Sequence, residues 1–145
     1  MSNYFKGIVA GFIATTVMTL LMFVKNYFGV FTELNVVDVI DNVNTSYFGL
    51  PKTAWGAWVV HFITGSVIYG IVFAFFNPKL TESFTFNGII IGVGAWFVMM
   101  LLVFPLIGGG LFATVLGEHA RVASLGLHVV YGVVLGYSYG KIGGS

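Results

Sequence analysis

The sequence predicts an all-α integral membrane protein, a bundle of four transmembrane helices, and three observations lead to this class. Hydrophobic residues make up 58% of the 145 residues and charged residues only 8%, with a mean hydropathy of +0.98. A soluble domain carries about 25% charged residues, because its surface must be solvated. Four apolar runs are long enough to cross the hydrocarbon core, which takes about 20 helical residues. The charged residues all lie between these runs or at their ends, as a bilayer requires.

The first apolar run covers roughly Lys6–Val24. It is too long for the core of a signal peptide, and no small-residue cleavage site follows it, so we expect it to remain as the first span. The loop after it, Lys25–Thr53, contains the stretch "TELNVVDVIDNVN", in which the apolar residues that fall at helical spacing are Val36, Val37, Ile40 and Val43. We therefore expect a short amphipathic helix there, begun by Thr32, that lies in the membrane interface or covers the end of the bundle.

The other three runs cover roughly Ala54–Phe76, Phe86–Ile107 and Val122–Lys141. Within the third, Pro105 removes a backbone donor and displaces the carbonyl group one turn earlier. The helix is therefore expected to kink or end at this residue. The flexible sequence "GGG" follows within three residues.

The two halves of the chain resemble each other, which predicts an internal duplication within a single domain, 1–145. The segment Gly7–Phe23 aligns with Gly88–Phe104, and a separate alignment of the second and fourth spans places His61 on His128. Each half is a helical hairpin, about 6–76 and 86–141. Two hairpins of the same orientation would be parallel repeats, related by a pseudo-two-fold axis along the membrane normal. Glycines spaced four apart would let their helices approach closely in lipid.

Composition excludes several functions. A net charge of +1 gives no basis for binding nucleic acid. The absence of cysteine excludes disulfides, thiolate metal sites and a thiol nucleophile. Since there is no catalytic triad and no phosphate-binding loop, we expect no catalytic activity from the chain alone. The expected environment is the lipid bilayer of a prokaryotic cytoplasmic membrane, with the N-terminus in the cytoplasm. The sequence is compatible both with a homodimer and with a larger membrane complex.

Two histidines lie inside predicted spans, and they are the main candidates for function. His61 and His128 sit at matching depths in the second and fourth spans, so the predicted symmetry would bring them face to face. Ionisable residues inside a membrane are costly and often functional. The interpretation we favour is a b-type haem bound by both imidazoles, as in a small electron-transfer protein or subunit. Gly65 and Gly132, one turn beyond each histidine, would leave room for the macrocycle.

Further residues extend this hypothesis. Lys52, His119 and Arg121 lie near the same membrane face and could meet the haem propionates. Met18 and Met99 are predicted at the depth of the histidines, and two thioethers with two imidazoles form a ligand set suited to copper(I). The alternative is a cofactor-free protein, either an accessory subunit of a membrane complex or a small transporter-like protein, in which the histidines are structural or gate a pathway.

The stretch "LGLHVVYGVVLGYSYG" (Leu125–Gly140), together with "GGGLF" (Gly108–Phe112), resembles an uncharacterised family of small prokaryotic four-span membrane proteins. The resemblance covers essentially the whole chain. It implies the four-span architecture and no particular activity, cofactor or site residue.

Overall fold

The computed structural model describes residues 2–33 and 35–143, and within them the fold is helical throughout. Helix α1 (Asn3–Tyr27) forms the first span and α7 (Glu118–Gly143) the fourth. The second span joins α3 (Ala54–Phe62), a π-helical turn and α4 (Tyr69–Phe76). The third joins α5 (Phe84–Val98), a second π-helical turn and α6 (Phe104–Leu106). All four helical stretches are long and apolar enough to cross a membrane, which confirms the predicted four-span class.

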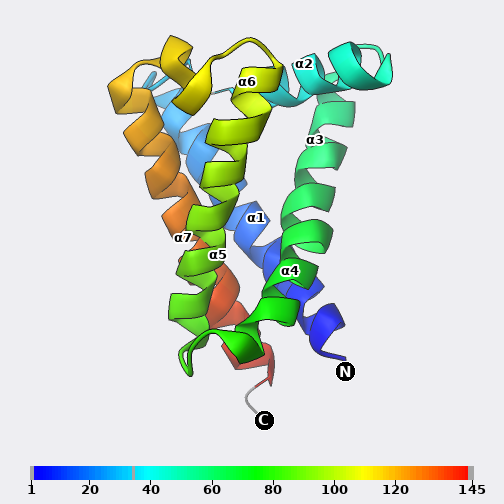
Figure 1. Cartoon of the computed structure of the whole chain (residues 1–145), viewed down its shortest axis with the longest axis vertical. Helices are drawn as coiled ribbons and strands as arrows, with labels where there is room; N and C mark the ends of the chain where they lie inside the picture. Colours follow the sequence, from blue (N-terminus) through cyan, green and yellow to red (C-terminus); the bar gives the residue numbers. More distant parts are fainter. Residues whose placement is uncertain (1, 34, 144–145) are drawn as a thin grey trace.

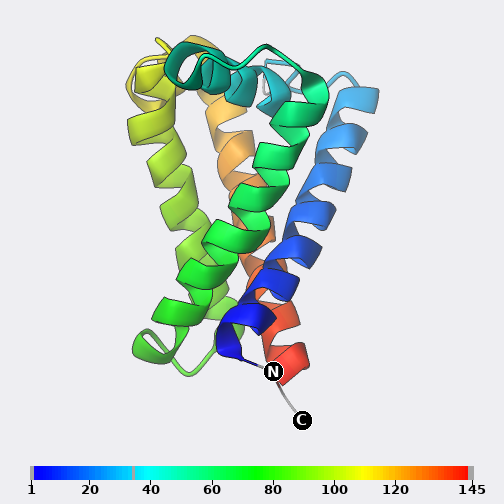
Figure 2. The ribbon, with the colours of Figure 1, turned by 90° about the vertical axis from the view of Figure 1, so that its right-hand side faces the viewer.

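The spans run up and down, so that both termini lie at the same end of the bundle, here called the termini end (Figure 1). At the opposite end, α2 (Val36–Phe48) lies across the spans, and we call this the covered end (Figure 2). The 3-10 segment Leu111–Leu116 lies at the covered end as well. Helix α1 packs against α4 and α7, and α7 also packs against α5, whereas α3 packs mainly on α2.

Helix α2 is the amphipathic helix expected in the long loop, but it begins later than Thr32. The side chain of Asn35 accepts a hydrogen bond from the backbone amide of Val37, which makes Asn35 the N-cap. Thr32 lies outside the helix and its cap. The helix ends at Gly49, whose φ of 63° is the left-handed conformation that glycine adopts most easily.

Two π-helical turns interrupt the spans, at Ile63–Ile68 and Met99–Val103. In the first, the amide of Tyr69 bonds to the carbonyl of Thr64, five residues back; in the second, the amide of Phe104 bonds to the carbonyl of Met99. Such turns insert an extra residue and often mark functional sites. The second turn comes directly before Pro105, and the helix ends at Leu106, as the proline predicts.

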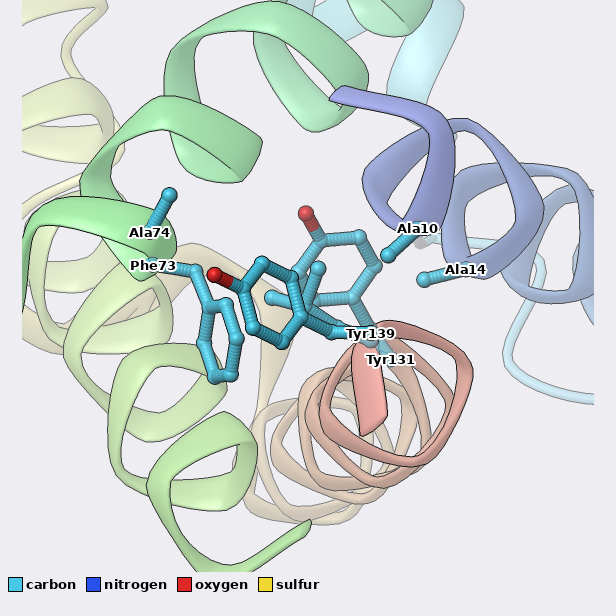
Figure 3. Close-up of a cluster of buried hydrophobic side chains, with 7 residues drawn as sticks. Ala10, Ala14, Phe73, Ala74, Tyr131 and Tyr139 are labelled. Atoms are coloured by element: carbon cyan, nitrogen blue, oxygen red, sulfur yellow. The ribbon is translucent and has the colours of Figure 1, made fainter. Parts of the chain in front are cut away.

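Glycines let the backbones approach closely in the half of the bundle nearer the termini end. A Cβ atom on Gly7 would overlap the carbonyl of Gly70, and one on Gly88 would overlap the backbones of Gly132 and Gly136. Interhelical van der Waals packing of this kind is what stabilises helix association in lipid. Beside these contacts lies the largest buried cluster (Figure 3), formed by Ala10, Ala14, Phe73, Ala74, Tyr131, Leu135 and Tyr139.

Both hairpins therefore pack through glycines at the same end of the bundle. The pseudo-two-fold relation between them stays a prediction. The π-helical turns fall in the second and third spans, which the predicted symmetry does not pair with each other.

Candidate functional site

A cavity of about 320 Å³ lies at the covered end, between the spans and α2. Every span and α2 contribute to its walls, which are mainly apolar with a few polar groups, a composition typical of ligand sites. The apolar side chains that line it include Val36, Val39, Ile40, Val43, Val60, Val103, Phe104 and Leu127. The polar ones include Asn35, Asn44, Thr64 and Ser124. Because α2 supplies four of these aliphatic residues, its apolar face forms the cover of the cavity.

Both predicted histidines line this cavity, His61 from α3 and His128 from α7. Each is half-buried. The structure thus brings together two imidazoles from separate spans, inside the part of the protein that is expected to lie in the membrane.

His128 is held by a hydrogen bond from its Nδ1 to the backbone carbonyl of Ser124, at 2.8 Å. A carbonyl oxygen only accepts, so Nδ1 carries the proton and Nε2 keeps its lone pair. Ser124 is itself fixed: its hydroxyl accepts a bond from the indole nitrogen of Trp96 (2.9 Å) and donates one to the carbonyl of Arg121 (2.8 Å). A chain of bonds from α5 therefore ends at the carbonyl group that orients His128.

His61 has a different partner. Its Nε2 lies 3.2 Å from the hydroxyl Oγ1 of Thr19 on α1, a residue that is buried. The rings of Trp58 and Phe62 meet the imidazole edge-on, with centroids 5.6 and 5.7 Å away. The two histidines thus differ in which ring nitrogen is bonded and in whether the partner is backbone or side chain.

Met18 and Met99 line the same cavity, from α1 and from the π-helical turn of the third span. Met22 joins them one turn along α1. The candidate set of two imidazoles and two thioethers therefore comes from four different spans. Among the described residues, no group of three or more His, Cys, Asp or Glu side chains is placed to hold a metal ion.

Gly65 and Gly132 do not line the cavity. A Cβ atom on Gly65 would overlap the side chain of Thr15, and one on Gly132 would overlap the carbonyl of Gly88. Each glycine instead allows the helix that carries a histidine to pack closely on its neighbour. Tyr131 adds a bond between spans at this level, because its hydroxyl donates to the carbonyl of Gly65 at 2.5 Å.

Lys52 lies between α2 and α3, and His119 and Arg121 lie in the first turn of α7; none of the three is part of the cavity wall. The ammonium group of Lys52 donates to the side-chain oxygen of Asn42 on α2, at 3.0 Å. The Nε of Arg121 donates to the carbonyl of Gly117 in its own helix turn, and His119 is exposed.

Helix α2 is attached to the spans by side-chain hydrogen bonds. The hydroxyl of Tyr47 donates to the carbonyl of Leu106 at the end of the third span, at 2.6 Å. The carboxylate of Asp41 accepts the amide of Thr53, at 3.3 Å. These bonds hold the cover against the ends of the second and third spans.

Sequence reasoning missed Thr19, Ser124 and the cover residues as parts of the site. Ser124 lies four residues before His128 in the same helix, and Thr19 lies one residue after Met18. Only the spacing of Ser124 and His128 pointed to a contact, because residues four apart in a helix are neighbours.

The fold and this site define a class: a small four-span membrane protein with a covered cavity between its helices. The chain belongs to the family described as "Family of unknown function (DUF6789)", whose model matches residues 1–145. No curated protein and no solved structure matches the chain.

Proposed function

We propose that this protein is a small b-type cytochrome-like electron-transfer protein or subunit, with a haem bound by His61 and His128. One observation carries the proposal: two imidazoles from separate spans line a single cavity at the covered end. A haem with two axial imidazoles exchanges single electrons and needs no substrate at the iron. The protein would then act with a redox partner rather than catalyse a reaction alone.

The chemistry of the residues supports this assignment. A histidine that binds a metal through one ring nitrogen usually donates a hydrogen bond from the other ring N–H to a carbonyl or carboxylate group, which fixes the tautomer. His128 is bonded in this way to the carbonyl of Ser124. The largely apolar wall would exclude water from the site. Lys52, His119 and Arg121 supply positive or titratable groups at the same end, where propionates would leave the bundle.

The size of the cavity sets a condition on haem binding. At about 320 Å³ it lies at the small end of the range for ligand pockets, about 300–1,000 Å³. Because α2 forms the cover, a macrocycle requires α2 to move outward. The bonds that hold α2, from Tyr47 and to Asp41, involve side chains and can break without unfolding a span.

Copper(I) is a second candidate, favoured by the positions of Met18 and Met99. Both thioethers line the cavity together with the two imidazoles. Soft thioether sulfur and imidazole nitrogen suit copper(I). A single ion would need far less room than a macrocycle, so α2 could stay in place.

An absorbance spectrum of protein purified from haem-replete cells tests the proposal. We expect a Soret band that is lost or shifted in His61→Ala and His128→Ala. The matched control is Trp55→Phe, on α3 like His61 but exposed and outside the cavity wall, which should leave the band unchanged.

A colourless protein that also fails to take up added hemin would overturn the haem assignment. Elemental analysis of the same preparation then decides about copper: a copper content that falls in Met18→Leu and Met99→Leu supports the second candidate. A preparation that contains neither haem nor copper would indicate a cofactor-free accessory subunit or transporter-like protein.

Location and partners complete the proposal. We propose that the protein lies in a prokaryotic cytoplasmic membrane with the termini end in the cytoplasm, as a homodimer or as part of a larger complex that contains its redox partner. The basic residues divide equally between the two faces, and four of the five acidic residues fall on the side of the covered end, which favours this orientation.

A further inference from the structure

The two histidines of the cavity are held in different ways, and the difference predicts an order of binding. We infer that His128 is the pre-organised ligand of the cavity and that Thr19 masks His61 until a ligand displaces it. This inference rests on the proposed function for the identity of the ligand, but the contacts that carry it are hydrogen bonds between the chain's own residues.

His128 is fixed at both its ring and its backbone. The bond from Nδ1 to the carbonyl of Ser124 leaves the lone pair on Nε2, and Ser124 is held in turn by Trp96. The carbonyl of His128 lies against Gly92 of α5, so close that a Cβ atom there would overlap it. Ligation through Nε2 therefore needs no bond to break around His128.

His61 cannot offer its Nε2 without losing a bond. If the hydroxyl of Thr19 donates to Nε2, it occupies the lone pair; if Nε2 donates to the hydroxyl, that nitrogen carries a proton. Either arrangement excludes a metal from Nε2. Thr19 is thus a positioning residue that competes with the ligand for His61.

The packing of the second span would allow His61 to move away from Thr19. His61 lies in α3, which packs mainly on the cover helix α2, whereas the π-helical turn and α4 pack closely on α1. The π-helical turn and α4 thus hold the second span to α1 through close backbone contacts, whereas α3 meets α1 through side chains, among them the ring of Phe62 on that of Phe12. A shift of α3 would separate the imidazole from Thr19 without disturbing the glycine contacts near the termini end.

The test uses hemin as the probe, added to the full-length protein in nanodiscs. With wild type we expect a spectrum with a five-coordinate, high-spin component, since His128 binds before His61. Thr19→Val removes the hydroxyl at nearly constant shape, so it should convert this component to six-coordinate, low-spin haem. It should also tighten binding about threefold to tenfold, the equivalent of one hydrogen bond.

Two control variants belong to this experiment. Thr19→Ser keeps a hydroxyl and should behave as wild type. Thr16→Val changes a threonine on the same helix whose hydroxyl bonds to the carbonyl of Phe12, and it should have no effect. Among the histidine variants, His61→Ala should keep five-coordinate binding and His128→Ala should abolish it; the reverse result would overturn the inference.

A second measurement separates this inference from the proposed function. In ligand-free protein labelled with ¹⁵N-histidine, NMR should show Nε2 of His128 unprotonated, and a signal of His61 that changes in Thr19→Val but not in Thr16→Val. If hemin never binds while these signals appear, the haem assignment fails and the asymmetry of the histidines stands. A protonated Nε2 on His128, or no response of His61 to Thr19→Val, would refute the inference itself.

Discussion

The two ends of the bundle differ in what fills the space between helices. Toward the termini end, backbones touch through glycine pairs such as Gly7 with Gly70, and buried aromatic side chains such as Phe73 and Tyr139 fill the space beside them. At the covered end, the spans diverge around the cavity, and α2 lies over the gap (Figure 1). Close backbone packing extends from the termini end as far as Gly92, which lies against the carbonyl of His128. Beyond this level the cover helix α2 is attached by side-chain hydrogen bonds instead.

The largest effect on stability should come from the tightly packed half. Gly88→Ala on α5 places a methyl group against the carbonyl of Gly132, a backbone atom that cannot rotate away. Overpacking of this kind costs about 1–3 kcal/mol of the free energy of unfolding. Thermal unfolding in detergent measures the loss.

Gly94→Ala is the matched control for this change. Gly94 lies on the same helix, but a Cβ atom there would meet no neighbour within 4 Å. Alanine is the better helix former by up to about 1 kcal/mol, so this variant should be as stable as wild type or more so. Equal losses in the two variants would show that the glycines serve helix flexibility rather than close contact.

An intermediate effect is expected where the two halves meet. Tyr131→Phe removes the hydroxyl that donates to the carbonyl of Gly65, in the π-helical turn below His61. A buried polar group left without its hydrogen bond costs about 1–3 kcal/mol of the free energy of unfolding. We expect a loss in the lower part of this range, because the carbonyl of Gly65 stays within the backbone of its helix. Unfolding of Tyr131→Phe should therefore begin a few degrees below that of Tyr137→Phe, whose ring is exposed on the same helix.

The smallest effect on stability should come from the cover. Tyr47→Phe removes the bond from α2 to the carbonyl of Leu106, at an exposed site, and should lower the free energy of unfolding by no more than about 0.5 kcal/mol. Stopped-flow mixing should instead show that hemin is taken up about twofold to threefold faster. Tyr27→Phe, also exposed at the covered end, is the control. A stability loss as large as that of Tyr131→Phe would mean that α2 is part of the core and not a movable cover.

The membrane spans and the loop helix could be predicted from the sequence, because both follow from local composition and periodicity. Four runs of apolar residues specify spans whatever their neighbours are, and the spacing of Val36, Ile40 and Val43 already identified the apolar face of α2. The cap of α2 was misplaced because Thr32 and Asn35 are both good cap residues, and only the backbone decides between them.

The candidate site was predictable only in part. The positions of His61 and His128 within their spans predicted that they would meet, and both line the cavity. The roles of Gly65 and Gly132 did not, since a glycine beside a cavity and a glycine beside a helix look the same in sequence. The contact of Thr19 with His61 depends on the rotation of α1 and α3 about their axes, whereas Ser124 lies one turn from His128 in the same helix. That rotation is set by contacts between spans, which composition does not encode.

The π-helical turn of the second span has a consequence for comparing the two halves of the chain. It adds one residue between His61 and Gly70, whereas α7 is regular over the corresponding stretch. The glycine contacts differ by more than this one residue: Gly7 meets Gly70, nine residues after His61, whereas Gly88 meets Gly132, four residues after His128. An ungapped alignment of the halves can therefore match the imidazoles or the glycine contacts, but not both. Searches for ancestral single-hairpin relatives should allow a shift of five residues between the histidine and the contact glycine.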